Sequence, residues 1–415
     1  MSPALASLLA LLAAIVISFA SRLNVGLVAI PLAWAVGAFG GRTPEAVLTG
    51  FPTSLFVTLA GVTLLFALAE TNGTIGALAA RLAALASGRS RLLPPLMFLA
   101  ACAISTAGPG AIPSVALMAP LAFAMAPAAA IPPFLTALMV ANGANAGNLS
   151  PLSAVGIVAN SRMAEAGLGG HEWKVWAANF FVHALVAAVA YAVLVRRIPL
   201  DPPGAGDRHP SPPPVDRVQR GTIVIIAGWV AAVVGLNAPI GLAAFAAAAV
   251  VIAARLADER SALRAMPWAA IIMVCGVSML VTMAERNGGM QLFTALLATL
   301  ATPSTLNGVI AFVTGAISSA SSTSGVVLPT FLPTAPGLVQ QVGGGDPLAV
   351  ALSINVGASL VDVSPLSTLG AICVAAISHP DAARDLFRRM LIWGLSMAVV
   401  AAALCWLLAG WFARL

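Results

Sequence analysis

The sequence predicts an all-α polytopic membrane protein made of two inverted-topology repeats with discontinuous helices. Of its 415 residues, 60% are hydrophobic and only 8% are charged, whereas soluble domains carry about 25% charged residues. Apolar runs of roughly 20 residues, the length of a membrane-spanning helix, recur along the chain. Three blocks of sequence also occur twice in the same order, which indicates an internal repeat.

The repeated blocks lie at a nearly constant offset of 213 to 215 positions. They pair 68–85 with 283–300, 103–120 with 316–333, and 148–157 with 362–371. The last pair is the closest, reading "NLSPLSAVGI" and "DVSPLSTLGA". We therefore divide the chain into halves at 1–195 and 221–415.

Each half is expected to hold about five spans and one re-entrant hairpin. In chain order, the first half gives spans at about 4–20, 23–39 and 51–69, a hairpin at about 92–126, a broken helix at about 133–160 and a span at 173–195. The second half gives spans at about 221–236, 238–254 and 267–284, a hairpin at about 305–338, a broken helix at about 347–377 and a span at 390–411. Replacing each hairpin by two full crossings is an alternative, so the hairpins rest on their polar tips alone.

A short segment follows the third span of each half, at 74–86 and 289–301, just after the repeat-related Glu70 and Glu285. We expect both segments to be interfacial helices, although plain loops are an alternative. For the two glutamates we favour a structural role, capping or docking these helices, over a role in a proton relay.

The segment 196–220 is rich in proline and charge, and it predicts a solvated cytoplasmic linker. Because five spans per half is an odd number, the halves must be inverted relative to each other. With the linker inside a bacterial inner membrane and both termini outside, three of every four basic residues fall on the inner side, as the positive-inside rule requires. The outer side receives only Arg42, Arg162, Lys174, Arg286 and Arg414.

Four segments interrupt the apolar spans with Gly, Pro, Ser, Thr or Asn. They are the hairpin tips 105–110 and 318–325 and the kinks 142–153 and 355–367. A helix broken at membrane depth frees backbone groups that only protein or a water-filled cavity can satisfy. Freed N–H groups suit a carboxylate and freed carbonyls suit a cation such as Na⁺, which is the site architecture of secondary transporters. A simple kink packed by a neighbour is the alternative for any one break.

The tips and kinks supply the candidate binding residues. One half-site combines Ser105, Thr106, Asn142, Asn145, Asn148 and Ser150, and the other combines Ser322, Thr323, Ser359, Asp362 and Ser364. Asp362 is the one carboxylate inside a kink, and its repeat equivalent is Asn148. It is expected to bind Na⁺ or carry a coupled proton, although a carboxylate capping the next helix is an equally good interpretation. A Na⁺ site is expected near Asn145, Asn148 and Asp362.

No Arg or Lys falls at a tip or kink, so an anionic substrate would be neutralised by helix dipoles, hydroxyls, amides and bound cations. The basic residues form no cluster with interleaved aromatics, so no nucleic-acid partner is expected. No phosphate-binding loop or metalloprotease motif occurs in the sequence, and the serines of "STSG" lack a convincing histidine partner. We expect neither an enzyme nor a cofactor beyond the coupling ion.

At these tips and kinks the chain resembles the divalent anion/sodium symporters of the ion transporter superfamily, and the "SPLS" kinks resemble most the dicarboxylate (malonate) carriers of the MatC type. The resemblance implies a homodimer in which a transport domain moves as an elevator against a scaffold. It also implies symport of a small dicarboxylate, such as malonate or succinate, with Na⁺ or H⁺. The symporters carry a Ser-Asn-Thr triplet at each tip, whereas this chain has Ser105-Thr106 and Ser322-Thr323-Ser324, which leaves the number of cation sites open. An ion antiporter of the same superfamily, with Asp362 as its exchange site, is the alternative function.

Overall fold

The computed structural model describes residues 2–20, 23–84, 91–127, 129–197, 214–236, 238–319, 322–377 and 380–414, and within these ranges the chain forms helices and no strand. The all-helical class is therefore confirmed. The first half contains α1 (Pro3–Ala20), α2 (Val25–Phe39), α3 (Pro44–Leu48), α4 (Thr53–Thr71), α5 (Thr74–Ala84), α6 (Leu93–Thr106), α7 (Ala111–Met125), α8 (Pro133–Asn148), α9 (Ala154–Glu165) and α10 (Glu172–Leu194).

The second half follows the same order with more interruptions. It contains α11 (Arg217–Leu236), α12 (Ile240–Ala253), α13 (Glu259–Ala265), α14 (Trp268–Arg286), α15 (Gly289–Ala298), α16 (Leu306–Ser318), the π-helical turn η2 (Thr323–Val327), α17 (Leu328–Phe331), η3 (Leu332–Thr334), α18 (Ala335–Val342), α19 (Pro347–Leu360), η4 (Val361–Val363), α20 (Thr368–Ala375) and α21 (Pro380–Arg414). Within the described ranges, four helical stretches are long and apolar enough to cross a membrane: Thr53–Thr71, Glu172–Leu194, Pro347–Ala375 and Asp381–Arg414.

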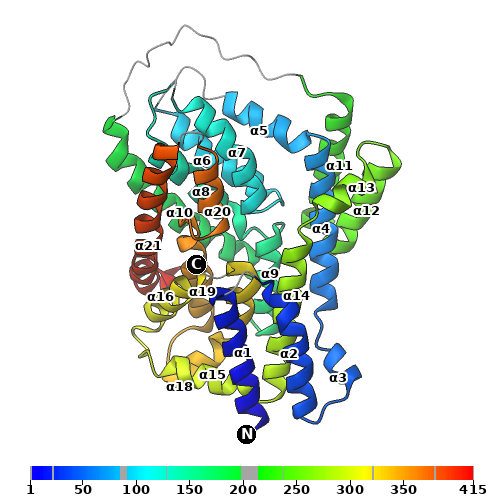
Figure 1. Cartoon of the computed structure of the whole chain (residues 1–415), viewed down its shortest axis with the longest axis vertical. Coiled ribbons are helices and arrows are strands. Elements are labelled where there is room, and N and C mark those ends of the chain that lie inside the picture. Colours follow the sequence, from blue (N-terminus) through cyan, green and yellow to red (C-terminus); the bar gives the residue numbers. More distant parts are fainter. Residues whose placement is uncertain are drawn as a thin grey trace.

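The helices after the third span of each half turn away from it. The axes of Ile271–Arg286 and Gly289–Ala298 differ by 91°, and α5 likewise begins directly after α4. The expectation of helices rather than loops at these positions is confirmed, with 85–86 outside the described residues. In Figure 1, α5, α6 and α7 lie toward one end of the molecule, and α15 and α18 lie toward the other.

Helices of one half pack against helices of the other half at glycines. Helix α2 packs on α14, and α12 packs on α4. A Cβ atom at Gly276 would lie 2.3 Å from the Gly26 carbonyl oxygen, and one at Gly61 would lie 2.4 Å from the Gly241 carbonyl oxygen. Gly26 and Gly241 are repeat equivalents, as are Gly61 and Gly276, so the same contact is made twice with the halves swapped. This exchange is what we expect of two repeats related by a twofold axis, although the inverted-repeat division stays an interpretation.

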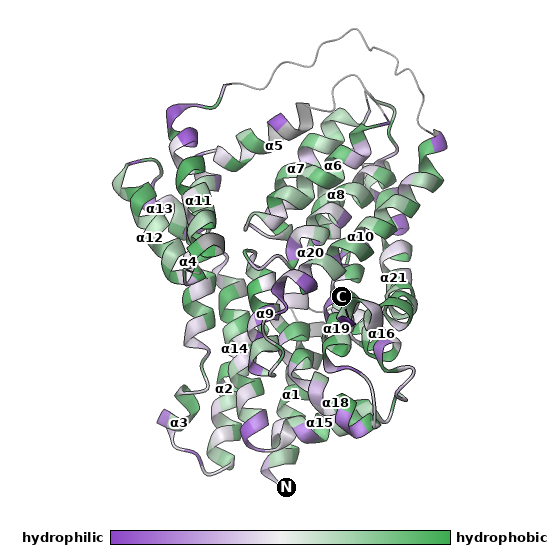
Figure 2. Ribbon diagram, turned by 180° about the vertical axis from the view of Figure 1, so that it is seen from behind, coloured by the Kyte–Doolittle hydropathy of each residue, from purple (hydrophilic) through white to green (hydrophobic). Residues whose placement is uncertain are grey.

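A second glycine pair brings each hairpin onto its broken helix. A Cβ at Gly143 of α8 would lie 2.3 Å from the Phe98 carbonyl oxygen of α6, and one at Gly357 of α19 would lie 2.4 Å from the Ala311 carbonyl oxygen of α16. The backbones therefore touch, and the polar tips are carried to the kinks. Figure 2 shows hydrophilic segments at both ends of the bundle and in its middle, near α9, α19 and α20.

Some boundaries differ from the sequence prediction. The end of the predicted linker, from Arg217, is the first turn of α11, because Asp216 accepts a bond from the Gln219 N–H at 2.7 Å while Gln219 accepts one from the Asp216 N–H at 3.2 Å. This reciprocal pair is a capping box, which starts a helix. Most of the linker, 198–213, lies outside the described residues.

The short helices α3 and α13 were not predicted. Thr43 and Asp258 cap them, and hydrogen bonds from the Ser261 side chain and N–H lower the pKa of Asp258. Helix α21 also begins ten residues before the predicted span, since Asp381 pairs with Arg384 and Asp385 with Arg389 along its first turns.

Candidate functional site

The first hairpin tip is held to the first kink by two hydrogen bonds. Helix α8 ends at Asn148, whose Oδ1 accepts from the Ala111 N–H, the first residue of α7, at 3.0 Å. The Ser150 hydroxyl donates to the Thr106 carbonyl, the last residue of α6, at 2.8 Å. The kink therefore satisfies free backbone groups on both arms of the tip.

The second tip meets the second kink through side chains. The Thr323 hydroxyl lies 2.9 Å from each carboxylate oxygen of Asp362 and donates to them. Because Thr323 has a single hydroxyl hydrogen, Ser318, at 2.6 Å, is the donor in their contact. Asp362 is only 9% exposed, and Ser322 caps the turn by accepting from the Gly325 N–H at 3.0 Å.

Each "SPLS" kink is built in the same way. In the first, the Ser153 hydroxyl donates to the Ser150 carbonyl at 3.0 Å and also to the Asn148 carbonyl. In the second, Ser367 donates to the Ser364 carbonyl at 2.8 Å and to the Asp362 carbonyl. The motif's final serine thus replaces helical hydrogen bonds that the break removes. This is a physical reason for the same polar sequence to occur twice in apolar surroundings.

A polar bridge joins the two broken helices. The Asn145 Nδ2 donates to the Ser359 carbonyl at 3.2 Å, and Asn145 and Ser359 are repeat equivalents. The Asn179 side chain of α10 donates to the Asn145 carbonyl at 2.7 Å. The two kinks therefore meet, as expected for a site shared by both halves.

Several buried oxygens around this bridge have no hydrogen-bond partner within the described part of the chain. They are Ser105 Oγ, Asn145 Oδ1, Asn179 Oδ1 and Asn355 Oδ1. A buried polar atom without a partner costs about 1–3 kcal/mol. Amide and carboxylate oxygens are ligands that hard cations prefer, so the unpartnered amide oxygens are candidate ligands for a cation.

The predicted residues do not all take part in the same way. Asn142 is buried but bonds to the Leu138 carbonyl at 2.9 Å and to His183 at 3.1 Å, so it faces α10. Ser359 turns its hydroxyl back to the Asn355 carbonyl at 2.7 Å and offers only its carbonyl to the bridge. Ser364 accepts from the Leu366 N–H at 3.3 Å, as Ser150 does from Leu152 at 3.2 Å.

Sequence reasoning did not include Asn179, Ser318, Ser153 and Ser367 in the site. The two kink serines are repeated in the motif, and that repetition was a usable signal. Asn179 is one of two buried polar residues of the apolar helix α10, with His183, a weaker signal that gains meaning only from its contact with Asn145.

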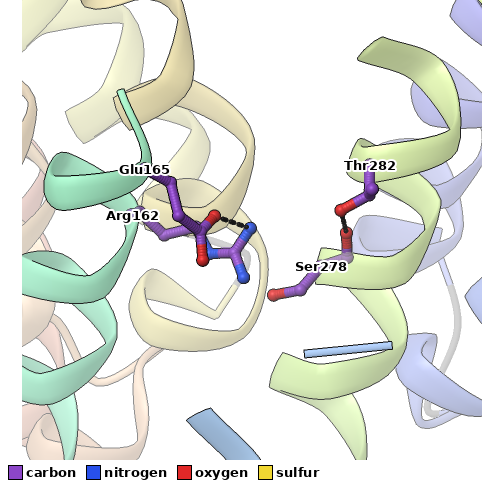
Figure 3. A network of polar contacts seen from close by, with 4 residues as sticks. All are labelled: Arg162, Glu165, Ser278 and Thr282. Carbon is purple, nitrogen blue, oxygen red and sulfur yellow. Dashed lines mark hydrogen bonds and ion pairs between the residues drawn. The ribbon is translucent and has the colours of Figure 1, made fainter. Parts of the chain in front are cut away.

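Arg162 also differs from expectation. It was placed among the outer loop charges, but it lies in α9 with only 2% of its surface exposed. Its Nη1 pairs with Glu165 at 2.8 Å, and Glu285 of α14 is a further acidic neighbour. Figure 3 shows the guanidinium directed toward α14, where the Ser278 side chain points back toward it.

An open hollow of about 590 Å³ reaches the first kink. Pro151 of the kink lines it, together with Thr53, Ser54 and Thr58 of α4 and Asn160 and Ser161 of α9. Apolar side chains such as Val57, Ile157 and Leu242 make up the rest of the lining, so polar and apolar groups face the same hollow beside the kink.

Comparison with known proteins supports a transporter architecture. Residues 1–148 match the family model described as "Dicarboxylate carrier protein MatC N-terminus", which confirms the resemblance predicted from the tips and kinks. The crystal structure of the Alcanivorax borkumensis YdaH transporter, whose topology is described as unusual, matches with a TM-score of 0.59 and 16% sequence identity, over 93% of this chain and 97% of that chain. At that identity the likeness establishes a shared fold. None of the curated proteins matches the chain.

Proposed function

We propose that this chain, which resembles the dicarboxylate carriers of the MatC type, is a secondary active transporter that couples a cation, Na⁺ or H⁺, to symport of a small dicarboxylate such as malonate or succinate. The observation that carries the proposal is the polar centre in which each tip bonds its own kink and Asn145 of the first kink bonds Ser359 of the second. A membrane protein without cargo has no need of four broken segments at this place.

Each part of the centre has a role in the proposal. Asp362 supplies the negative charge that attracts the coupling cation, and Thr323 holds its carboxylate in place. The unpartnered Asn145 oxygen adds a neutral ligand. The substrate carboxylates bind to hydroxyls, to the freed N–H groups of the helices that start at the kinks, and to the bound cation.

In the same proposal, α5 and α15 connect the moving hairpins and broken helices to the scaffold helices, and the working unit is a homodimer in the bacterial inner membrane. Helix α6 packs closely on α8, and α16 packs closely on α19. Such packing lets each hairpin move together with its broken helix as a rigid unit.

Uptake of labelled malonate and succinate into proteoliposomes tests this function. We expect accumulation driven by an inward Na⁺ or H⁺ gradient, and loss of that gradient dependence in Asp362→Asn. Asp346→Asn is the matched control, since Asp346 caps α19 by accepting from the Leu348 N–H at 2.9 Å and Asn caps equally well. Na⁺-driven proton movement without carboxylate uptake would instead establish the antiporter, and carboxylate uptake indifferent to any cation gradient would refute coupling.

A further inference from the structure

The junction of α9, α14 and the second hairpin holds a buried arginine that the tip and kink centre does not use. Arg162 is 2% exposed, and its Glu165 partner is 52% exposed at the side chain. The ion pair engages Nη1 only. The Nε donor is buried without a hydrogen-bond partner in the described residues.

The facing helix has a matching unsatisfied group. Ser278 of α14 is fully buried, and its hydroxyl also has no partner within the described ranges. In Figure 3 the Ser278 side chain and the guanidinium point toward each other from opposite helices. Two orphaned groups on the two sides of one junction call for a third group that satisfies both.

An anion with at least two oxygens meets that need. The edge of a guanidinium that carries Nε binds carboxylates through parallel N–H donors, and a serine hydroxyl donates to the same group. We infer that Arg162 and Ser278 form a carboxylate-binding subsite between α9 and α14, a position to which the sequence assigned only loop charge. For its ligand, the inference rests on the proposed function.

Arg162 lies outside both kinks in the sequence. It follows Ser153, the N-cap of α9 in the first kink, by nine residues, which places it about 13 Å further along α9, and malonate and succinate are too short to bridge that length. The second kink is nearer, because the Asn355 Nδ2 contacts the sulfur of Met163, the residue after Arg162, at 3.5 Å. The subsite therefore holds a carboxylate before or after it occupies the first kink.

The local charges define how the subsite works. Glu165 and Glu285 are the acidic neighbours of Arg162, so the guanidinium is neutralised when no substrate is present. An arriving carboxylate competes with these groups for the guanidinium. Removing Glu165 should therefore strengthen anion binding, whereas a purely structural ion pair would lose stability and show no change in binding.

Stabilisation of the purified protein against heat, titrated with malonate, succinate and chloride, tests the subsite together with the KM for malonate uptake. Ser278→Ala removes one donor without touching the Glu165 pair, and we expect the apparent Kd and KM for malonate to rise about tenfold, the loss of one hydrogen bond to a charged group. We expect Arg162→Lys to show a similar rise, since a point charge replaces the fork, and Glu165→Gln to lower the apparent Kd.

Several outcomes would overturn the subsite. Unchanged malonate binding in Ser278→Ala would do so, as would equal losses of stability in Arg162→Gln and Glu165→Gln without any change in Kd. Chloride stabilisation equal to that by malonate, with the same sensitivity to Ser278→Ala, would replace the carboxylate with an inorganic anion. If wild-type protein binds malonate through Ser278 but does not transport it, the proposed function fails while the subsite stands.

Discussion

Asp362 supplies the one negative charge among the tips and kinks, so the proposed cation chemistry depends on it. A buried carboxylate is costly unless paired or protonated, and here its partner is the Thr323 hydroxyl, a neutral group. Asn148 holds the equivalent place in the first half and accepts a backbone N–H. The two half-sites are thus alike in the positions that meet, and they differ in the bonded group, a backbone N–H or a hydroxyl, and in charge. A single buried negative charge suits one cation that binds and is released. Two buried carboxylates would repel each other unless a cation or a proton stayed bound to them.

Substitution of Thr323 tests this reading at the residue scale. Thr323→Val keeps the shape and removes the donor, which we expect to cost about 1–3 kcal/mol of stability and to reduce cation-coupled uptake at least tenfold. Thr323→Ser keeps the hydroxyl and should remain close to wild type in both the melting temperature and proteoliposome uptake. Equal uptake by the Val and Ser variants would show that the hydroxyl has no part in coupling.

Residue types could be predicted from the sequence better than their orientations. Asp362, Asn148 and Thr323 were identifiable because they lie in the few polar breaks of an apolar chain. The direction of Asn142 toward His183 was not, since it depends on how α8 packs against α10. Arg162 was misplaced for a similar reason. Charge patterning assigns a basic residue near a span's end to solvent, and only the packing of α9 against α4, α17 and η3 shows that it is buried.

At the scale of elements, close backbone contact positions the site. The first arm of each hairpin lies against glycines of its broken helix, Gly143 and Gly147 in α8 and Gly357 in α19. Because the helices touch along their backbones, a displacement of the tip displaces the kink as well. The hydrogen bonds between tip and kink are short and local, so they would not survive a change in this helix spacing.

The contact at Gly357 gives a test with an internal control. A Cβ there would lie 2.4 Å from the Ala311 carbonyl oxygen and 2.6 Å from its Cα, so Gly357→Ala must separate α19 from α16. We expect a loss of about 1–3 kcal/mol from this overpacking and a larger fractional loss of uptake. In α11, a Cβ added at Gly228 would have no neighbouring atom within 4 Å, so Gly228→Ala should stabilise the protein by about 0.5–1 kcal/mol. Melting curves in detergent compare the two, and a neutral Gly357→Ala would contradict the role of the close contact.

Most elements followed from apolar length and polar interruption, because a membrane helix must be long and continuous where lipid surrounds it. The short helices α3 and α13 escaped prediction because five to seven residues are too few to show periodicity. Their caps, Thr43 and Asp258, were the available signal. The turn η2 also required the structure, since the sequence indicates where a helix breaks but not how it resumes.

At the scale of the whole molecule, the glycine contacts explain why a centre exists between the halves. Helices α2 and α14, and α12 and α4, form the same contact with the halves exchanged. Such an exchange ties each half to the other at two equivalent places, and Asn145 with Ser359 repeats it at the kinks. The constant spacing between the repeated sequence blocks predicted that the two halves have the same order of elements. It did not indicate which helices exchange partners, because that depends on packing between the repeats.

The orientation of the chain in the membrane can be tested with the two short helices, which are repeat counterparts. Glu45 and Glu259 are exposed first-turn residues of α3 and α13, and the positive-inside rule places α3 outside and α13 inside. All four native cysteines are buried, so a membrane-impermeant maleimide should report only an introduced thiol. In intact cells we expect Glu45→Cys to be labelled and Glu259→Cys to be labelled only after permeabilisation. The opposite pattern would reverse the orientation, and labelling of both in intact cells would place the two helices on the same side, which is incompatible with inverted halves.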